Sequence, residues 1–316
     1  MKNVTMRQLR IFSAVAQHLS FARAAETLHL TPPAVSMQVK ELEASVGLPL
    51  FDRSGRRVSL TTTGEYMLAY ARRVLAVMKD AEDTIARFRG LTGGQLAIGM
   101  VSTAEYFLPQ FLARFRAEHP GVALCLRVGT REQVVGMMQG NEVDLAIMGR
   151  PPKEWATRAE PFALHPHVIV TAVDHPFVRQ GRVQVEALAG EAFIVREQGS
   201  ATRALLDAYL QQHRIELRVA MEMTSNEAIK QAVMAGMGIG LMSAHTIALE
   251  LRCGLIATPD VDGLPVVRRW HVVHNLGKTL SPAAEAFRYF TLEHGERFLA
   301  ECFGAPPAAL PYTEPL

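Results

Sequence analysis

The segment between Phe21 and Leu42 constrains the fold of this chain more than any other stretch. It reads FARAAETLHL TPPAVSMQVKEL: a short amphipathic helix, a tight break, and a second helix that opens with Thr31-Pro32-Pro33. Two apolar sets repeat at helical spacing, namely Ala24, Ala25 and Leu28 in the first helix and Val35, Val39 and Leu42 in the second. Two short helices that meet steeply across such a break form a helix-turn-helix, whose second helix enters the major groove of DNA. The segment therefore predicts binding to duplex DNA.

Length and composition indicate a multi-domain protein of the cytoplasm. A chain of 316 residues is expected to form two or three domains, and 49% hydrophobic with 20% charged residues is typical of a soluble globular protein. No apolar run reaches about 18 residues, the length of a membrane span, and the N-terminus has no signal-peptide core. We expect Cys125, Cys253 and Cys302 to be buried thiols in a reducing compartment, because they show no metal-ligand spacing.

A basic excess lies on the N-terminal part of the chain. Residues 1–60 carry eight basic and four acidic side chains, a net charge of +4 (8 − 4), which leaves −2 for the remainder. Within this part, residues 52–60 read DRSGRRVSL, which predicts a two-stranded wing with basic residues at its Ser-Gly turn. Arginines on such a wing are placed to contact phosphate or the minor groove. A solvated surface is the alternative explanation of the charge excess.

The second motif helix is expected to expose Ser36, Met37 and Lys40. Ser36 can donate to a base or a phosphate, Met37 can meet a thymine methyl, and Lys40 is placed for phosphate. Ordinary solvent exposure is the alternative. Thr31 is expected mainly as the N-cap of this helix, with a phosphate contact as a second role. The expected DNA-binding residues are Thr31, Pro32, Pro33, Ser36, Met37, Lys40, Arg53 and Arg56.

A long helix is expected from Thr61 to about Arg89. Its apolar residues recur in alternating steps of four and three, which is the period of a coiled-coil seam rather than of a globular helix face. These residues are Met67, Ala71, Val74, Met78, Ala81, Ile85 and Phe88. The pattern favours a dimerisation helix, and a helix packed only on its own domain is the alternative. A two-fold dimer would present two recognition helices to half-sites about one turn of DNA apart.

Beyond residue 94, strand and helix patterns alternate, which indicates parallel sheets covered by helices. About two hundred residues favour two small sheets over one large sheet. The predicted strands are 95–101, 122–128, 143–148, 162–173, 192–196, 217–223, 239–242, 255–259 and 266–273. The predicted helices are 106–118, 132–139, 202–213, 227–235, 246–252 and 282–299.

Hydroxyl, glycine and arginine residues follow several of these strands. In open parallel sheets, ligands bind beyond the carboxyl ends of the strands, where helices begin. Free N–H groups at helix starts, together with arginines, suit an anion, so a phosphate or carboxylate metabolite is expected there. Routine helix capping is the alternative for each serine and threonine. The expected effector-binding residues are Ser102, Thr103, Thr130, Arg131, Gly149, Arg150, Ser200, Thr202, Arg203 and Asn226.

The sequence contains no recognisable pattern for catalysis. The glycine-rich run 236–240 lies between a helix and the following strand, the wrong order for a dinucleotide loop, and no nucleophile elbow is present. His165 and His167 share one face of a strand without a third ligand, so we expect paired surface or core histidines rather than a metal site. We expect no enzyme, no catalytic residues, and no resident metal or cofactor. A solute-binding or metabolic protein with an incidental helical head is the alternative from another class.

Four stretches resemble the LysR-type bacterial transcriptional regulators: Leu9–Phe12, Ser20–Ala25, Leu30–Ser36 and Gly47–Arg53. The resemblance covers nearly the whole chain. Pro32 stands where the family often has glutamine, so a base contact from that position does not follow from the family pattern.

The resemblance implies an α+β protein in four parts. These are a winged helix-turn-helix DNA-binding domain (1–60), a linker and dimerisation helix (61–92), an effector-binding module (93–303) and a flexible tail (304–316). The module would resemble the periplasmic binding proteins and contain two α/β Rossmann-like subdomains. Subdomain I would comprise about 93–163 and 267–303, and subdomain II about 164–266.

Residues 141–152, which read NEVDLAIMGRPP, are most similar to the members that regulate Calvin-cycle carbon-fixation operons, and residues 229–233 and 245–251 agree. This resemblance implies activation of the operon for the CO2-fixing enzymes. The implied partners are double-stranded promoter DNA, RNA polymerase, further copies of the chain in a dimer or tetramer, and a phosphorylated metabolite or NADPH, but no membrane. A LysR-type regulator of another operon, for aromatic or amino-acid metabolism, stays open as the alternative.

Overall fold

The computed structural model describes residues 4–52, 58–88 and 94–304 of the chain. It divides into two compact units, Met1–Leu91 with Gln139–Glu142, and Thr92–Met138 with Val143–Leu316. Within the described ranges, no helix is both long and apolar enough to cross a membrane.

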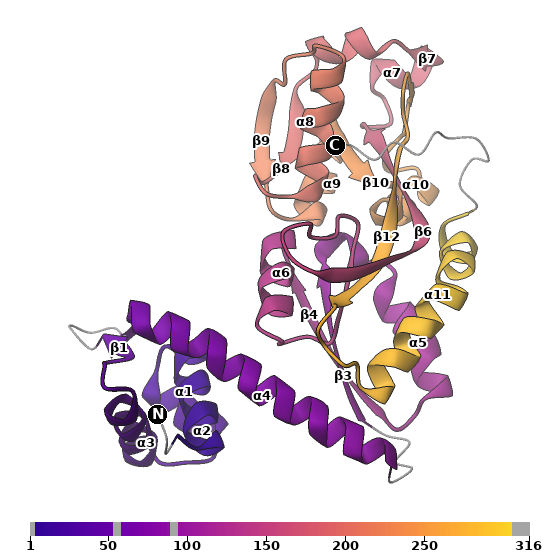
Figure 1. Cartoon of the computed structure of the whole chain (residues 1–316). Helices are drawn as coiled ribbons and strands as arrows, with labels where there is room; N and C mark the ends of the chain where they lie inside the picture. The colour runs from indigo at the N-terminus through magenta and orange to yellow at the C-terminus, as the bar shows by residue number, and fades with distance from the viewer. Residues whose placement is uncertain (1–3, 53–57, 89–93, 305–316) are drawn as a thin grey trace. The chain divides into compact units, whose positions relative to one another are not determined.

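The first unit packs three short helices against the beginning of a long one (Figure 1). Its elements are α1 (Met6–His18), α2 (Phe21–Thr27), α3 (Pro32–Val46), β1 (Phe51–Asp52), β2 (Ser59–Leu60) and α4 (Thr62–Phe88). Strands β1 and β2 are antiparallel, so the predicted wing is present. Five of the six residues of the two predicted apolar faces are at most 1% exposed, namely Ala24, Ala25, Val35, Val39 and Leu42, and Leu28 is half-buried. The helix-turn-helix prediction is therefore confirmed at the level of fold.

Local sequence determines where these helices begin and end. Thr5 and Gln8 form a reciprocal capping box at the start of α1, in which the Gln8 N–H donates to Thr5 Oγ1 at 3.2 Å. Gly47 ends α3 with a φ of +82°, a left-handed conformation that favours glycine. Gly64, in the first turn of α4, passes so close to the Leu50 carbonyl oxygen that a Cβ would clash with it. Glycine therefore allows α4 to lie against the turn that precedes the wing.

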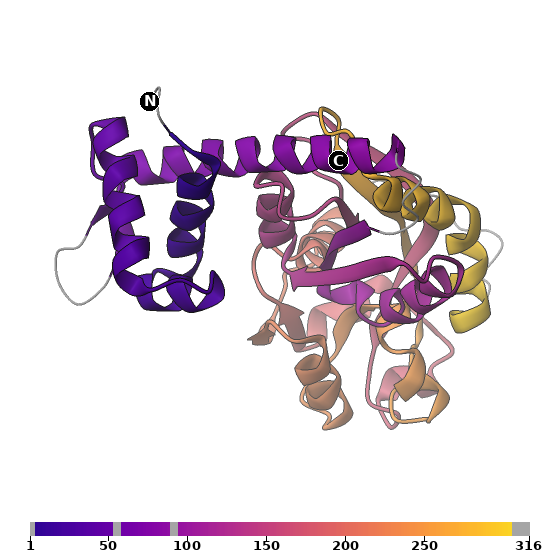
Figure 2. The same ribbon diagram turned by 90° about the horizontal axis from the view of Figure 1, so that it is seen from below.

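The expected seam of helix α4 has two environments. Met67 and Ala71 are buried in the core shared with α1, with 9% and 1% exposure. Val74, Met78 and Ile85 are 40%, 41% and 55% exposed. Helix α4 continues well beyond α1–α3 as one uninterrupted helix (Figure 2). The heptad residues near the start of α4 therefore pack within the first unit, whereas Val74, Met78 and Ile85 farther along the helix are exposed.

The second unit is built on one six-stranded mixed sheet of order β10-β6-β12-β5-β3-β4, so the prediction of two small sheets in place of one large sheet is wrong for its main sheet. Its strands are β3 (Gly94–Val101), β4 (Val122–Gly129), β5 (Leu145–Met148), β6 (Thr157–Val170), β10 (Gly240–Ser243) and β12 (Val266–Asn275). We call the part built on β3, β4 and β5 the β3 half. It also contains α5 (Leu108–Glu118), α6 (Arg131–Gln139) and α11 (Pro282–Phe303). Aromatic residues of α5 and α11 fill its core, where Phe111, Phe115 and Phe287 are at most 1% exposed.

The other part, which we call the β8 half, contains a parallel pair of strands. Its elements are β8 (Phe193–Arg196), β9 (Val219–Met223), β10, α8 (Ala201–Gln212), α9 (Asn226–Met234) and α10 (Ala248–Arg252). Shorter elements that the sequence patterns missed are α7 (Pro176–Arg179), β7 (Arg182–Val183), β11 (Asp260–Val261) and the 3-10 helices Ser102–Ala104, Val185–Gly190 and Ala244–Thr246.

Strands β6 and β12, which we call the crossing strands, run through both halves (Figure 1). They pair in antiparallel register from Thr157↔Asn275 to Val266↔His167, with one β-bulge beside Trp270. The prediction of parallel sheets holds for β3 with β4 and β5 and for β8 with β9, but it is wrong for β6, β10 and β12. A sequence pattern of alternating strands and helices predicts parallel pairs, because parallel neighbours are joined by a crossover helix. The crossing strands each run from one half into the other and pair antiparallel, so they need no such helix.

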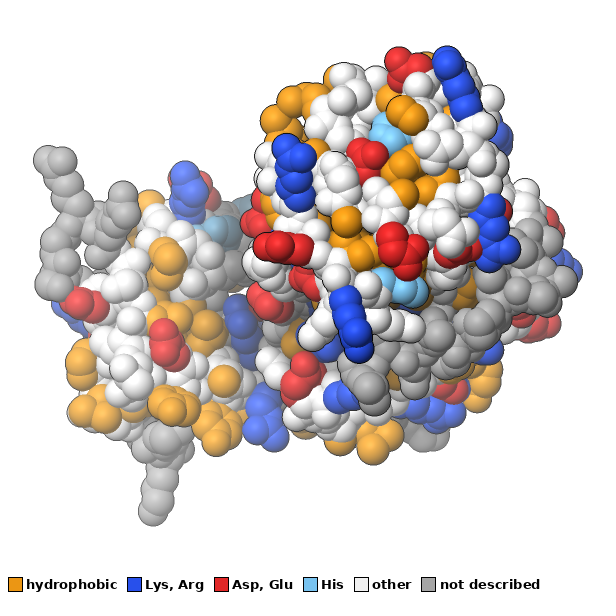
Figure 3. All heavy atoms as spheres, turned by 90° about the horizontal axis from the view of Figure 1, so that it is seen from above, with side chains coloured by type: hydrophobic (Ala, Val, Ile, Leu, Met, Phe, Trp, Pro, Cys, Tyr) orange, Lys and Arg blue, Asp and Glu red, His pale blue; other side chains and the backbone are white. Residues whose placement is uncertain are grey.

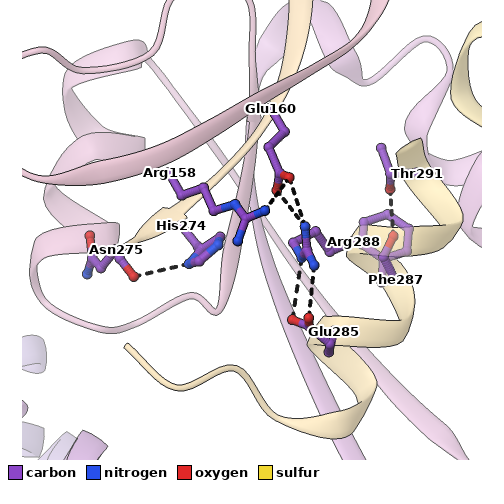
Figure 4. Close-up of polar contacts among 8 residues, drawn as sticks. All are labelled: Arg158, Glu160, His274, Asn275, Glu285, Phe287, Arg288 and Thr291. Carbon is purple, nitrogen blue, oxygen red and sulfur yellow. Dashed lines mark hydrogen bonds and ion pairs between the residues drawn. The ribbon is translucent and has the colours of Figure 1, made fainter. Parts of the chain in front are cut away.

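An ion-pair network fastens one end of the crossing strands to helix α11 (Figure 4). The Arg288 guanidinium donates to both carboxylate oxygens of Glu160, at 2.9 and 2.7 Å, and to Glu285 at 2.9 Å. Arg158 donates to the same Glu160 carboxylate at 2.9 Å. Arg288 is 3% exposed, and a buried guanidinium needs such carboxylates to offset its lost hydration. The network therefore fixes β6 on the β3 half.

Other predictions differ from the described residues. Residues 255–259 form no named strand and contribute a single bridge, Ala257 with Thr171. None of the three cysteines is buried: Cys253 is exposed, and Cys125 and Cys302 are half-buried. Cys125 lies on β4, an edge strand with one side uncovered. Residues 89–92 of the expected linker helix and 305–316 of the expected tail lie outside the described ranges, and Gly94 begins β3.

Candidate nucleic-acid interface and ligand cleft

Helix α3 presents a partly apolar, partly basic surface on the side opposite its buried face. Met37 is 55% exposed, Lys40 is exposed and Ser36 is half-buried. Pro32 and Pro33 occupy the first turn and are also exposed. The structure therefore leaves the expected contact residues of this helix accessible, with Ser36 less exposed than expected. Arg53 and Arg56 of the wing lie outside the described residues.

Thr31 stands at the N-cap position of α3, but its side chain makes no capping hydrogen bond. The expectation that its side chain holds the helix end is therefore wrong. A capping hydroxyl accepts from the second or third N–H of the helix. Pro33 is the second residue of the helix and has no N–H, so one of these two donors is lost and the Ala34 N–H is the one that remains.

A narrow cleft lies where the crossing strands pass between the two halves. It is lined by Ser102 and Thr103 after β3, Thr130 and Arg131 after β4, and Gly149 and Arg150 after β5, and the β8 half contributes Ser200 and Thr202. Eight of the ten expected effector residues are thus brought together. Arg203 and Asn226 do not line the cleft. Its volume is about 30 Å³, space for one or two water molecules.

Arg203 and Asn226 instead support a residue that the sequence patterns missed. Arg196, at the end of β8, lines the cleft and is 7% exposed. Its Nη1 donates to Asn226 Oδ1 at 2.7 Å, and its carbonyl oxygen accepts from Arg203 Nη1 at 3.2 Å. Arg196 also pairs with Glu197, the one carboxylate among the cleft-lining residues. Arg203 and Asn226 therefore hold Arg196 in place and do not themselves line the cleft.

Arg268 of β12 is a second arginine that the sequence patterns missed. Unlike Arg196, which pairs with Glu197, it has no carboxylate partner within the described part of the chain. It is 7% exposed, and its Nη1 donates to the Ala201 carbonyl oxygen at 2.8 Å. Burial, with a smaller contribution from the charge of Arg150, lowers the pKa of Arg268 to about 10. The group stays charged at neutral pH, so the cleft contains a buried cation without a counter-ion.

Two histidines of β6 complete the wall. His165 and His167 are 3% and 1% exposed. His165 stacks on Trp270, with 3.9 Å between ring centroids, and its Nε2 lies 2.9 Å from Ser243 Oγ. Its Nδ1 has no hydrogen-bond partner. A Cβ on Gly149 would lie 2.8 Å from that Nδ1, so glycine leaves the room that the His165 ring needs. Burial lowers the pKa of both histidines, to about 3 for His167.

The hydroxyl groups of the cleft differ in their local roles. Thr130 Oγ1 accepts from the Gln133 N–H at 3.3 Å, which is the capping role given as the alternative. Ser200 is the N-cap residue of α8 but makes no side-chain capping bond. Ser200 and Thr202 are 7% and 8% exposed. The start of α8, a 12-residue helix, therefore directs backbone N–H groups and two hydroxyls at the cleft.

The cleft as a whole is suited to an anion. Arg131, Arg150, Arg196 and Arg268 face a single carboxylate, Glu197. On the outside of this unit, by contrast, acidic and basic side chains are interspersed on the face shown in Figure 3. The sequence patterns missed the histidines and Arg268 because these residues lie within crossing strands, whereas the topological rule points to strand ends.

Two family models match consecutive parts of the chain. The model described as bacterial regulatory helix-turn-helix protein, lysR family, matches residues 6–65, and the LysR substrate binding domain matches residues 89–296. The chain belongs to the LysR family of transcriptional regulators. It is therefore a DNA-binding regulator with an effector-binding module, and the predicted fold class is confirmed. Members of this family bind promoter DNA and small-molecule effectors and form oligomers.

This LysR-family regulator is similar to other transcriptional regulators along most of its length and to a solved regulatory domain. It is 47% identical over 304 residues to the HTH-type transcriptional regulator CfxR of Cupriavidus necator, covering 96% of each chain. It is 43% identical over 295 residues to the RuBisCO operon transcriptional regulator of Allochromatium vinosum, covering 93% of this chain and 98% of that one. A solved structure of the Synechocystis PCC6803 CcmR regulatory domain in complex with 2-PG has a TM-score of 0.61 at 38% identity, covering 63% of this chain and 96% of that chain.

His165 and His167 are the two histidines in the described part of the chain that line the cleft. Among the described residues, no group of three or more His, Cys, Asp or Glu side chains is arranged to hold a metal ion. His165 and His167 contribute neutral rings to the cleft wall instead.

Proposed function

We propose that this LysR-family regulator binds the promoter of a CO2-fixation operon in the cytoplasm and activates it under the control of an anionic, phosphorylated metabolite. The observation that carries the proposal is the cleft, where four arginines meet the N-terminus of α8. The name of the Allochromatium vinosum relative supports the operon. The 2-PG held by the CcmR regulatory domain supports control by a small molecule.

In the proposed complex, each group of the cleft has a stated role. Arg268 and Arg150 pair with the anionic group, because they are the cleft arginines without a carboxylate partner within the described ranges. Ser200 and Thr202 donate hydroxyl hydrogen atoms, and the first N–H groups of α8 donate to the same anion. NADPH carries phosphate groups as well and is the second ligand to test.

Ligand binding must change the spacing of the two halves. The cleft volume of about 30 Å³ is too small for a metabolite, so the halves separate to admit it. An effector shifts this equilibrium only as far as it prefers one spacing over the other. We propose that the change alters the relative placement of the two DNA-binding domains in a dimer, and with it the contact with RNA polymerase.

Isothermal titration calorimetry of the full chain with 2-PG, NADPH and inorganic phosphate tests the cleft. We expect saturable binding of at least one phosphate compound, and we expect Thr202→Ala to weaken it. Thr224→Ala, at an exposed threonine outside the cleft, is the matched control. Equal affinity in Thr202→Ala and wild type would remove Thr202 from the site, and the absence of binding to all three compounds would reject the cleft as a phosphate site.

The proposed dimer uses the exposed apolar residues of α4. Met78→Glu places a charge in the seam and should shift the chain toward monomer in sedimentation velocity. Ala69→Glu, at an exposed position outside the seam, is the control and should leave the oligomer intact. An unchanged oligomer in Met78→Glu would favour the alternative, in which the helix serves only its own domain.

The operon is tested by mapping binding sites across the genome and repeating the binding with purified promoter fragments. We expect a site upstream of the genes for the CO2-fixing enzymes and a rise in transcript when RNA polymerase and effector are added. Sites confined to genes of aromatic or amino-acid metabolism would replace the proposed operon and leave the family assignment unaffected.

A further inference from the structure

A second cavity opens on the other face of β6. Its volume is about 460 Å³, and it lies between β6, the segment 258–265 and the end of α11. Successive residues of a strand face opposite sides of the sheet. His165 and His167 therefore line the cleft, whereas Pro166 between them lines the second cavity. Pockets that bind small molecules have volumes of about 300–1,000 Å³, so the second cavity has the size of a ligand site.

The charges of the second cavity oppose those of the cleft. Asp260 and Glu296 are the charged residues among those that line it, and no lysine or arginine is present there. The rest of the wall consists largely of leucine, valine, alanine, proline and phenylalanine side chains. A phosphate or carboxylate would meet two carboxylates without a compensating cation. The cavity is therefore complementary to an uncharged, largely apolar molecule.

His245 supplies a specific polar group to this apolar wall. It is 6% exposed, and the Trp270 Nε1–H donates to its Nδ1 at 3.1 Å. Because Nδ1 accepts, the hydrogen of the neutral ring must lie on Nε2. That Nε2–H has no hydrogen-bond partner within the described part of the chain. Nε2 is not among the fully buried polar atoms that lack a partner, so it is accessible from the second cavity, where an acceptor oxygen of a ligand can take its hydrogen bond.

We propose that the second cavity is a binding site for an uncharged, largely apolar carbonyl compound, such as a ketone, ester or amide, whose oxygen accepts from His245 Nε2. The apolar body of the ligand fills the space beside Pro166 and Val168, and the two carboxylates exclude anions. Nothing in this assignment depends on what the cleft binds.

The two sites share one tryptophan. The Trp270 ring is fully buried, stacks on His165 of the cleft and donates to His245 of the second cavity. A ligand on either side therefore changes the surroundings of the same indole. The chain has two tryptophans, so Trp155→Phe leaves Trp270 as the sole tryptophan.

The test uses the fluorescent ketone prodan and the anionic dye 8-anilino-1-naphthalenesulfonate on the full chain carrying Trp155→Phe. We expect saturable prodan binding, one molecule per chain, with energy transfer from Trp270 to prodan. The sulfonate dye should bind at least 10-fold more weakly. Ala300→Phe and Val168→Phe, which fill the cavity from α11 and from β6, should each lower prodan affinity at least 10-fold. Glu293→Phe, at an exposed position of α11 outside the cavity, should not.

Several results would overturn the proposal. Prodan that binds both filled variants as well as wild type does not occupy this cavity. Equal affinity for the sulfonate dye would contradict the role of the carboxylates. Prodan that binds only a chain shortened by residues 305–316 would assign the cavity to that segment instead. If either filled variant is unfolded by circular dichroism, the other variant and the energy transfer from Trp270 decide the outcome. Adding 2-PG is a separate measurement, and its failure would bear on the proposed function of the cleft alone.

Discussion

Replacing Arg268 by methionine should weaken phosphate binding without destabilising the ligand-free protein. Burial lowers the pKa of Arg268 to about 10, so folding disfavours the charged form that predominates at pH 7. A lowering of this size corresponds to a cost on the order of 3 kcal/mol, which is an upper limit because nearby water and dipoles relax around the charge. Methionine removes the charge and keeps much of the volume. The unfolding free energy of Arg268→Met should therefore equal or exceed that of wild type.

The same substitution removes a charge-assisted hydrogen bond to the proposed anion. Such a bond contributes about 1.5–3 kcal/mol, so the dissociation constant for a bound phosphate compound should rise about 10- to 150-fold. Titration calorimetry gives the affinity, and urea unfolding without ligand gives the stability. Arg269→Met, at the exposed neighbouring position, is the control for both. Affinity within twofold of wild type, or a larger loss of stability than in Arg269→Met, would refute the reasoning that Arg268 is a preformed and uncompensated anion contact.

Three further outcomes are expected. Lys40→Ala should weaken binding to specific and random DNA alike and lower the salt slope by about one; an unchanged slope would remove Lys40 from the interface. Burial lowers the pKa of His167 to about 3 and of His245 to about 4, so the unfolded chain takes up more protons below about pH 6.5. The free energy of unfolding should therefore be highest above about pH 6.5 and should fall as the pH is lowered toward about 4. Equal free energies of urea unfolding at pH 7 and pH 5 would contradict this. The Tyr106 hydroxyl donates to Glu227 at 2.6 Å between the two halves, so Tyr106→Phe should ease opening and tighten effector binding about 2- to 10-fold; weaker binding in calorimetry would reject the opening step.

The helix-turn-helix could be predicted from sequence because its signals are local. The periodicity of Val35, Val39 and Leu42 reports burial directly, and the glycine after α3 marks its end. Thr31 illustrates the limit of such signals. Its position as N-cap follows from the prolines, but whether its hydroxyl is used as a cap depends on which N–H groups those prolines leave.

Much of the cleft could also be anticipated, since helix starts after parallel strands converge at one edge of a sheet. The rest depends on pairing between distant segments. Arg268 and His165 lie opposite each other because β12 pairs with β6. The local patterns of this sequence do not indicate which residues of these two strands pair. Glu160 and Arg288 are 128 residues apart and neither lies in a recognisable motif. Their contact follows only from the packing of α11.

The crossing strands restrict how the two halves can move. Sliding one strand along the other would break every pair of the ladder together, and stretching is opposed by two covalent backbones. Bending at the bulge beside Trp270 keeps the pairs on either side intact. The halves therefore have one compliant direction, a change in the angle between them, and this change of angle is what widens the cleft. Phe162 lies at that bulge, in close contact with Gly295 of α11. A substitution of Phe162 or Gly295 should therefore change how easily the two halves bend relative to each other for every ligand, but should not change which ligands bind.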